Sequence, residues 1–131
     1  MSKLFVNSTQ FYNLSLDLAQ KVIDKNFKPD FILGISRGGC IPSIIMHEYL
    51  NYKNIYCNYG IVTVKSYNKD NKRSDDIFID MSEYIKEQLE VSKNILIIDD
   101  VFDTGHTMMN LCNYLVGIGI YSNRFKTASV Y

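Results

Sequence analysis

ILIIDDVFDTGHT, residues 95–107, joins a short apolar run to three aspartates, a glycine and two threonines. The apolar run predicts a strand that is buried on both faces, as in a parallel sheet, with the polar residues at its carboxyl end. The adjacent carboxylates of Asp99 and Asp100 would repel one another there unless a divalent cation or sugar hydroxyls compensate. The threonines and Gly105 offer hydroxyl and N–H donors at a helix start, which is a pattern suited to a phosphate monoester.

A second apolar run is also followed by polar residues and glycines. FILGISRGGCIP, residues 31–42, is an apolar strand that leads through Arg37, Gly38 and Gly39 into a helix expected to begin near Pro42. Glycines let the backbone approach a ligand closely, and a guanidinium offers a planar fork to phosphate oxygens. A Gly-Gly turn between strand and helix is also common as simple turn geometry, so both interpretations stay open.

The rest of the chain alternates between the two periodicities. Strands are expected at residues 30–35, 55–64, 77–79, 94–99 and 124–131, and helices at residues 8–26, 41–50, 82–90 and 106–117. Ser8 or Thr9 is the expected cap of the first helix, which ends before Pro29. The alternation predicts an α/β fold with a mostly parallel sheet in one domain. The polar stretch at residues 64–77 is either a solvated loop or a functional flap.

Composition excludes several classes of function. Fourteen basic and fourteen acidic residues cancel, so no overall charge draws the chain to nucleic acid or to an anionic membrane surface. Cys40, Cys57 and Cys112 are far apart in the sequence, show no C-x-x-C pair and are interpreted as small core residues rather than as a disulfide framework or a zinc site. No apolar run approaches the roughly 18 residues that span a bilayer, and we expect a cytoplasmic protein.

The two strand ends and the polar stretch together resemble one known family. ILIIDDVFDTGHT resembles the 5-phosphoribosyl-1-pyrophosphate (PRPP) motif of type I phosphoribosyltransferases, with Phe102 where an aliphatic residue is commoner. GISRGG resembles the pyrophosphate loop of that family and VKSYNKDNKR its catalytic flap, and the likeness is greatest to the hypoxanthine, guanine and xanthine transferases. The resemblance implies a three-layer, Rossmann-like fold with a mostly parallel central sheet flanked by helices, and a flexible catalytic loop, over a single domain at residues 1–131.

The resemblance also assigns roles to residues. PRPP and its 5-phosphate would be bound by Asp99, Asp100, Asp103, Thr104, Gly105, His106 and Thr107, pyrophosphate by Arg37, Gly38 and Gly39, and the flap pair would be Ser66 and Tyr67. Asp103 would be the catalytic residue, facing the purine N7 as a base or hydrogen-bond partner. Asp99 and Asp100 would hold Mg²⁺, directly or through water. The family also often has a non-proline cis peptide at the position of Ser36–Arg37, and its sheet places the strand at 30–35 beside that at 95–99.

The implied reaction joins a purine base to PRPP and gives a nucleoside 5′-monophosphate and pyrophosphate, in a homodimer or larger homo-oligomer. The alternative is a non-catalytic regulatory domain that binds PRPP or a nucleotide on the same fold. An aspartic protease or a receiver domain fits less well, because the first is all-β and the second carries its acidic pair earlier in the chain. Relatives continue into a C-terminal hood that reads the base, whereas this sequence stops at Tyr131. We therefore expect the hood to be absent and the acceptor base to be unspecified.

Overall fold

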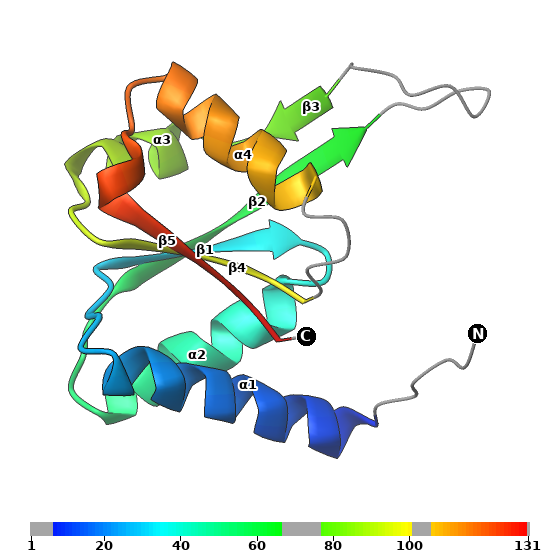
Figure 1. Ribbon diagram of the computed structural model, residues 1–131, viewed down its shortest axis with the longest axis vertical. Helices are drawn as coiled ribbons and strands as arrows, with labels where there is room; N and C mark the ends of the chain where they lie inside the picture. The colour runs from blue at the N-terminus through cyan, green and yellow to red at the C-terminus, as the bar shows by residue number, and fades with distance from the viewer. Residues whose placement is uncertain (1–6, 67–76, 101–105, 131) are drawn as a thin grey trace.

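A five-stranded sheet runs through the molecule and is covered by helices on both faces, as the computed structural model shows for residues 7–66, 77–100 and 106–130 (Figure 1). The elements in chain order are α1 (Ser8–Asp24), β1 (Phe31–Ser36), α2 (Cys40–Tyr52), β2 (Asn58–Ser66), β3 (Ile77–Asp80), α3 (Glu83–Val91), β4 (Ile95–Asp99), α4 (His106–Gly117), the short 3-10 helix η2 (Ser122–Arg124) and β5 (Phe125–Ser129). The strand order is β3-β2-β1-β4-β5, and only β3 runs antiparallel to its neighbour. This arrangement confirms the α/β fold expected from the sequence.

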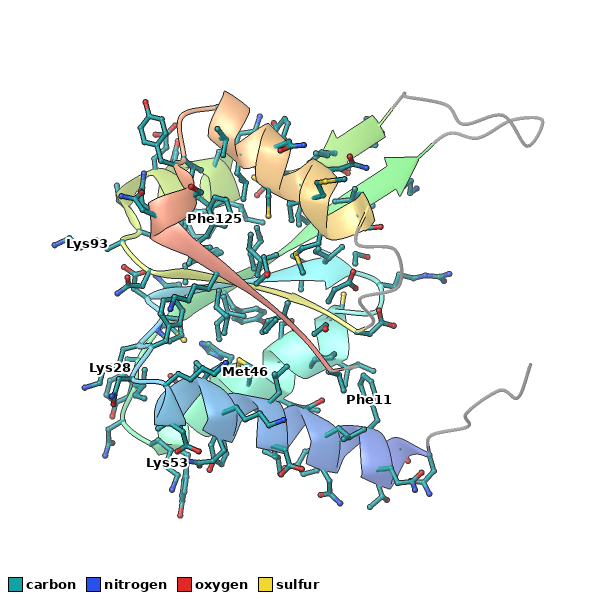
Figure 2. The ribbon with its side chains drawn as sticks, in the orientation of Figure 1. Phe11, Lys28, Met46, Lys53, Lys93 and Phe125 are labelled. Atoms are coloured by element: carbon teal, nitrogen blue, oxygen red, sulfur yellow. The ribbon has the colours of Figure 1, made fainter. Side chains whose placement is uncertain are left out.

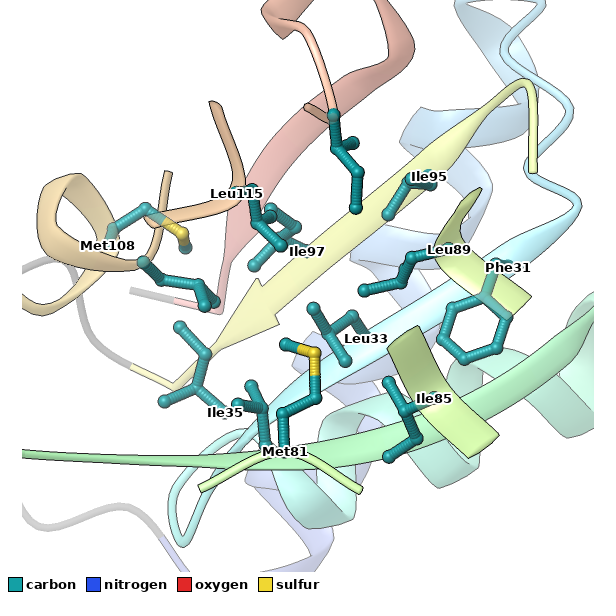
Figure 3. Close-up of a cluster of buried hydrophobic side chains, with 13 residues drawn as sticks. Phe31, Leu33, Ile35, Met81, Ile85, Leu89, Ile95, Ile97, Met108 and Leu115 are labelled. Atoms are coloured by element: carbon teal, nitrogen blue, oxygen red, sulfur yellow. The ribbon is translucent and has the colours of Figure 1, made fainter. Parts of the chain in front are cut away.

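The two central strands, β1 and β4, send alternate side chains into two separate cores. Phe31, Leu33 and Ile35 face the helices α3 and α4, while Ile32 faces α1 and α2. Figure 3 shows the first core, in which side chains of β1 and β4 pack against those of α3 and α4. Burial of β1 on both faces explains why its sequence is continuously apolar rather than alternating.

The second core lies under α1 and α2. Figure 2 shows Met46 of α2 between its helix and the sheet, where it is fully buried. The buried residues of this core are Ala19, Val22, Ile32, Met46, Leu50, Leu96 and Ile98. The cores on the two faces of the sheet together fix the positions of β1 and β4.

Among the described residues, no helix has both the length and the apolar character that a bilayer crossing requires.

The expected cap of the first helix was wrong. Asn7, not Ser8 or Thr9, caps α1, because its side chain accepts a hydrogen bond from the Gln10 backbone N–H at 2.8 Å. The Gln10 side chain accepts in return from the Asn7 N–H at 3.0 Å, which completes a capping box. A reciprocal pair satisfies two backbone donors, so it is favoured over a single serine or threonine cap.

The start of β2 also differs from expectation. The strand begins at Asn58 instead of residue 55, because pairing with β1 starts only at Phe31, the partner of Asn58. Ile55 is used instead to end the preceding helix, where its N–H donates to the Leu50 carbonyl at 2.8 Å. The apolar run that begins at Ile55 predicted a strand, but its first residue belongs to the turn that ends α2.

Asp30 joins the starts of β1 and β4, at the edge of the sheet where Figure 2 places Lys28 and Lys93. Its carboxylate accepts hydrogen bonds from the N–H groups of Lys93 at 2.8 Å and Asn94 at 3.0 Å. The Asp30 N–H donates to the Asn94 carbonyl at 2.9 Å. The three bonds set the register in which β1 and β4 begin.

We predict that Asp30→Ala lowers the free energy of unfolding by about 1–2 kcal/mol, because two backbone N–H groups lose their acceptor and water only partly replaces it. Urea unfolding followed by circular dichroism measures the change. Asp17→Ala, at an exposed position of α1, is the matched control and should change stability by less than about 0.5 kcal/mol. Equal effects of the two substitutions would contradict the assigned role of Asp30.

Candidate functional site

The acidic pair lies where β4 ends. Asp99 is the last residue of the strand, and both it and Asp100 are half-buried. The Asp100 backbone N–H donates to the Asp99 carboxylate at 2.8 Å. Burial raises the pKa of Asp99 to about 6, and the neighbouring Asp100 carboxyl adds to the increase, whereas the Asp100 N–H acts against it. Asp99 is thus a half-buried carboxyl group that holds its proton more strongly than an exposed aspartate does.

The end of β1 turns sharply into α2. The peptide bond between Ser36 and Arg37 is cis, which confirms the expectation drawn from the resemblance. The Gly39 N–H donates to the Ile35 carbonyl at 2.7 Å, and the Cys40 N–H donates to the Arg37 carbonyl at 3.1 Å. The turn is therefore held by backbone hydrogen bonds, and the Arg37 side chain is exposed at its tip.

The turn and the acidic pair are in direct contact. A Cβ placed on Gly38 would lie 2.1 Å from Cγ and 2.2 and 2.3 Å from the two carboxylate oxygens of Asp100. A Cβ placed on Gly39 would lie 2.3 Å from the Ile98 carbonyl oxygen. Real Cβ contacts this short do not occur, so at position 39, where the obstructing atoms are backbone, only glycine fits, whereas at position 38 a side chain would require the Asp100 carboxylate to move. The structure therefore brings Gly38, Gly39 and Asp100 together, as the sequence analysis expected for neighbouring strand ends.

Other expected site residues lie at the ends of elements or outside the described part of the chain. Ser66 ends β2, which continues past Thr63, the partner of Ser36. His106 begins α4, and Thr107 is exposed in the first turn of that helix. The expected site residues that fall outside the described residues are Tyr67, Asp103, Thr104 and Gly105.

Gly34 positions the turn and was not expected from the sequence to do so. A Cβ on Gly34, inside β1, would lie 2.5 Å from the Ser43 Oγ and 3.0 Å from the Gly39 carbonyl oxygen. Gly34 therefore allows the first turn of α2 to approach β1 closely. A lone glycine within an apolar strand was the available signal, because it commonly marks a close backbone approach.

The three cysteines were expected to be small core residues. Each has a free thiol and is half-buried, so the expectation that they are core residues is only partly met. Burial, followed by the charge of Asp30, raises the pKa of the Cys57 thiol to about 11, and burial raises that of Cys112. Both thiols therefore stay protonated and unreactive near neutral pH.

The sequence is similar to a protein-family model and to curated proteins. A model of the family described as "Phosphoribosyl transferase domain" matches residues 5–131. The chain is 29% identical to a xanthine-guanine phosphoribosyltransferase of Idiomarina loihiensis, over 81% of this chain and 60% of the relative. It is 28% identical to the hypoxanthine-guanine phosphoribosyltransferase of Saccharomyces cerevisiae, over 81% of this chain and 52% of the relative. The chain thus spans little more than half the length of these curated relatives.

A solved structure shows the same fold. The crystal structure of a purine phosphoribosyltransferase from Pyrococcus horikoshii superposes with a TM-score of 0.73 at 24% identity. The match covers 98% of this chain and 77% of that protein. The match supports the three-layer arrangement in Figure 1.

We predict that the titration of Asp99 makes the stability of the fold depend on pH. Because its pKa is higher in the folded than in the unfolded chain, protonated Asp99 favours folding below about pH 4, and this contribution is lost as the pH rises through 6. The free energy of unfolding of the unsubstituted chain should therefore fall relative to Asp99→Asn by about 1–2 kcal/mol from pH 4 to 7, since solvent screens part of the effect. Urea unfolding of both chains at pH 4, 5, 6 and 7 measures the difference, and a constant difference would contradict it.

Proposed function

Because the chain belongs to the phosphoribosyl transferase domain family, an enzyme family of pentosyltransferases, we propose that it transfers 5-phosphoribose from PRPP to a purine base. The products would be a nucleoside 5′-monophosphate and pyrophosphate. The base would be of the hypoxanthine, guanine or xanthine kind, in keeping with the curated relatives. The observation that carries the proposal is the direct contact between the Gly38–Gly39 turn and Asp100 at the carboxyl ends of β1 and β4.

This contact suits a substrate with two kinds of polar group. The turn after β1 would bind pyrophosphate through its backbone and through the Arg37 guanidinium, which is exposed and free to reach a flexible anion. The carboxylates of Asp99 and Asp100 would accept hydrogen bonds from the two ribose hydroxyls. PRPP carries both groups on adjacent carbons of one sugar, so one molecule would span the contact.

The acidic pair also fits Mg²⁺. The pair offers hard oxygen donors, and Mg²⁺ in enzymes is commonly held by one or two carboxylates together with substrate phosphates. Burial raises the pKa of Asp99, and a bound cation would favour its charged form. Among the described residues no cluster of three or more potential metal ligands occurs, in keeping with a site that the substrate completes. Bound Mg²⁺ would supply positive charge that stabilises the departing pyrophosphate.

The chain's own residues would perform four tasks in the transfer. Asp99 and Asp100 would orient the ribose so that its anomeric carbon faces the incoming purine nitrogen. Arg37 would stabilise the negative charge that develops on pyrophosphate as the C1–O bond breaks and an oxocarbenium-like sugar forms. Asp103 would accept the purine proton, or a hydrogen bond from the base, while Ser66 and Tyr67 of the flap would help exclude water.

We predict that the chain binds PRPP in the presence of Mg²⁺ and forms a nucleotide. PRPP at 100 times its dissociation constant should stabilise the fold by about 2.7 kcal/mol and raise the melting temperature. Calorimetry measures binding, and product assays with hypoxanthine, guanine, xanthine and adenine identify the base. Binding of PRPP without turnover of any base would favour the regulatory alternative, and absence of PRPP binding would refute both the proposed transfer and the PRPP-binding form of that alternative.

We predict that the aspartates separate into binding and catalysis. Asp103→Asn keeps the side-chain shape but removes the base, so turnover should fall by about 10²- to 10⁴-fold while PRPP binding is largely kept. Asp100→Asn should weaken PRPP binding itself, because a hydroxyl and metal acceptor is lost. Calorimetry and steady-state kinetics on both variants test this. Equal loss of PRPP affinity in the two variants would mean that Asp103 only positions the ligand.

A further inference from the structure

Gly38 and Asp100 come from different strands and have been assigned to different parts of the substrate. Gly38 belongs to the turn proposed to bind pyrophosphate, whereas Asp100 belongs to the pair proposed to bind the ribose. All three outer atoms of the Asp100 carboxyl group occupy the space that a Cβ of residue 38 would need, at 2.1 to 2.3 Å. From this contact we infer that Gly38 is a positioning residue for the Asp100 carboxylate, so that the pyrophosphate turn also determines how the ribose is bound.

The two glycines of the turn differ in what a side chain would displace. At Gly39 the obstructing atoms are backbone, namely the Ile98 carbonyl oxygen at 2.3 Å and the Ile35 nitrogen and oxygen at 2.8 Å. At Gly38 the obstructing atoms are the end of one short side chain, which can rotate. A methyl group at position 39 therefore disturbs the fold, whereas a methyl group at position 38 moves the Asp100 carboxylate and leaves the backbone in place.

Displacement of this carboxylate should weaken binding of the ribose, whereas a defect confined to pyrophosphate binding would not. The inference rests on the proposed function, in which Asp100 accepts hydrogen bonds from ribose hydroxyls. A hydrogen bond to a charged group contributes about 1.5–3 kcal/mol, so its loss corresponds to about a 10- to 100-fold decrease in affinity. Gly38→Ala should then weaken binding of a ligand that has the ribose but lacks pyrophosphate. Ribose 5-phosphate is such a ligand.

Calorimetry with ribose 5-phosphate, and separately with PRPP, both in the presence of Mg²⁺, tests the inference on the whole chain. Gly38→Ala should bind ribose 5-phosphate about 10- to 100-fold more weakly than the unsubstituted chain. Arg37→Ala changes an exposed side chain of the same turn, and it should lose affinity for PRPP while its affinity for ribose 5-phosphate stays within about twofold. Equal affinity of Gly38→Ala and the unsubstituted chain for ribose 5-phosphate would overturn the inference.

A double-mutant cycle isolates the contact itself. In an Asp100→Ala background the obstructing carboxylate is gone, so adding Gly38→Ala should change ribose 5-phosphate affinity by less than about twofold. The same loss in both backgrounds would overturn the inference, because Gly38 would then act without Asp100. If Gly38→Ala alone does not fold, the double variant should recover the fold, and failure to recover it would also overturn the inference.

The outcomes for the unsubstituted chain separate this inference from the proposed function. Failure of that chain to bind both PRPP and ribose 5-phosphate would refute the proposed function and the inference with it. Binding of PRPP without binding of ribose 5-phosphate would leave the proposed function standing and overturn the inference, because the ribose would then contribute no affinity of its own.

Discussion

The register that pairs Phe31 with Ile95 and Gly34 with Ile98 brings the ends of β1 and β4 to one edge of the sheet. From these ends the chain continues in opposite directions, through α2 to β2 and through α4 to β5. Such a reversal of strand order is the switch point at which open α/β sheets commonly bind ligands. The contact between Gly38 and Asp100 depends on this register. The roles proposed for the two residues therefore depend on it as well.

The same edge contains features that do not favour stability of the fold. Asp99 and Asp100 are adjacent half-buried carboxylates, and burial raises the pKa of the first. Three positions nearby, Gly34, Gly38 and Gly39, have no side chain, although each lies in or beside the core. Elsewhere in β1 and β4 large apolar side chains fill the space. Local departures of this kind are expected at functional sites, where a ligand later provides the missing interactions.

The sequence was sufficient to predict the elements and their order, because apolar periodicity reports burial directly. It was less informative at element ends, where short-range hydrogen bonding decides, as at Asn7 and at the start of β2. For the site, the polar residues that follow the apolar runs of β1 and β4 indicated that these two strand ends meet. The sequence could not show that the Asp100 carboxylate occupies the Cβ position of Gly38, because that distance depends on how two strands pair across the sheet. The positioning role of Gly34 was overlooked although a lone glycine within an apolar strand can mark a close backbone approach.

The hydrogen bonds of Asp30 have a consequence for the order in which the chain can fold. They join positions 63 and 64 residues apart, so the central pairing of β1 with β4 requires closure of a long loop. Closing such a loop loses chain entropy before any neighbouring contact is gained, and domains dominated by distant contacts fold slowly. By contrast, β2 and β3 are close in the chain and can pair early. We therefore expect the edge proposed to bind the substrate, which lies between the distant strands, to form late in folding.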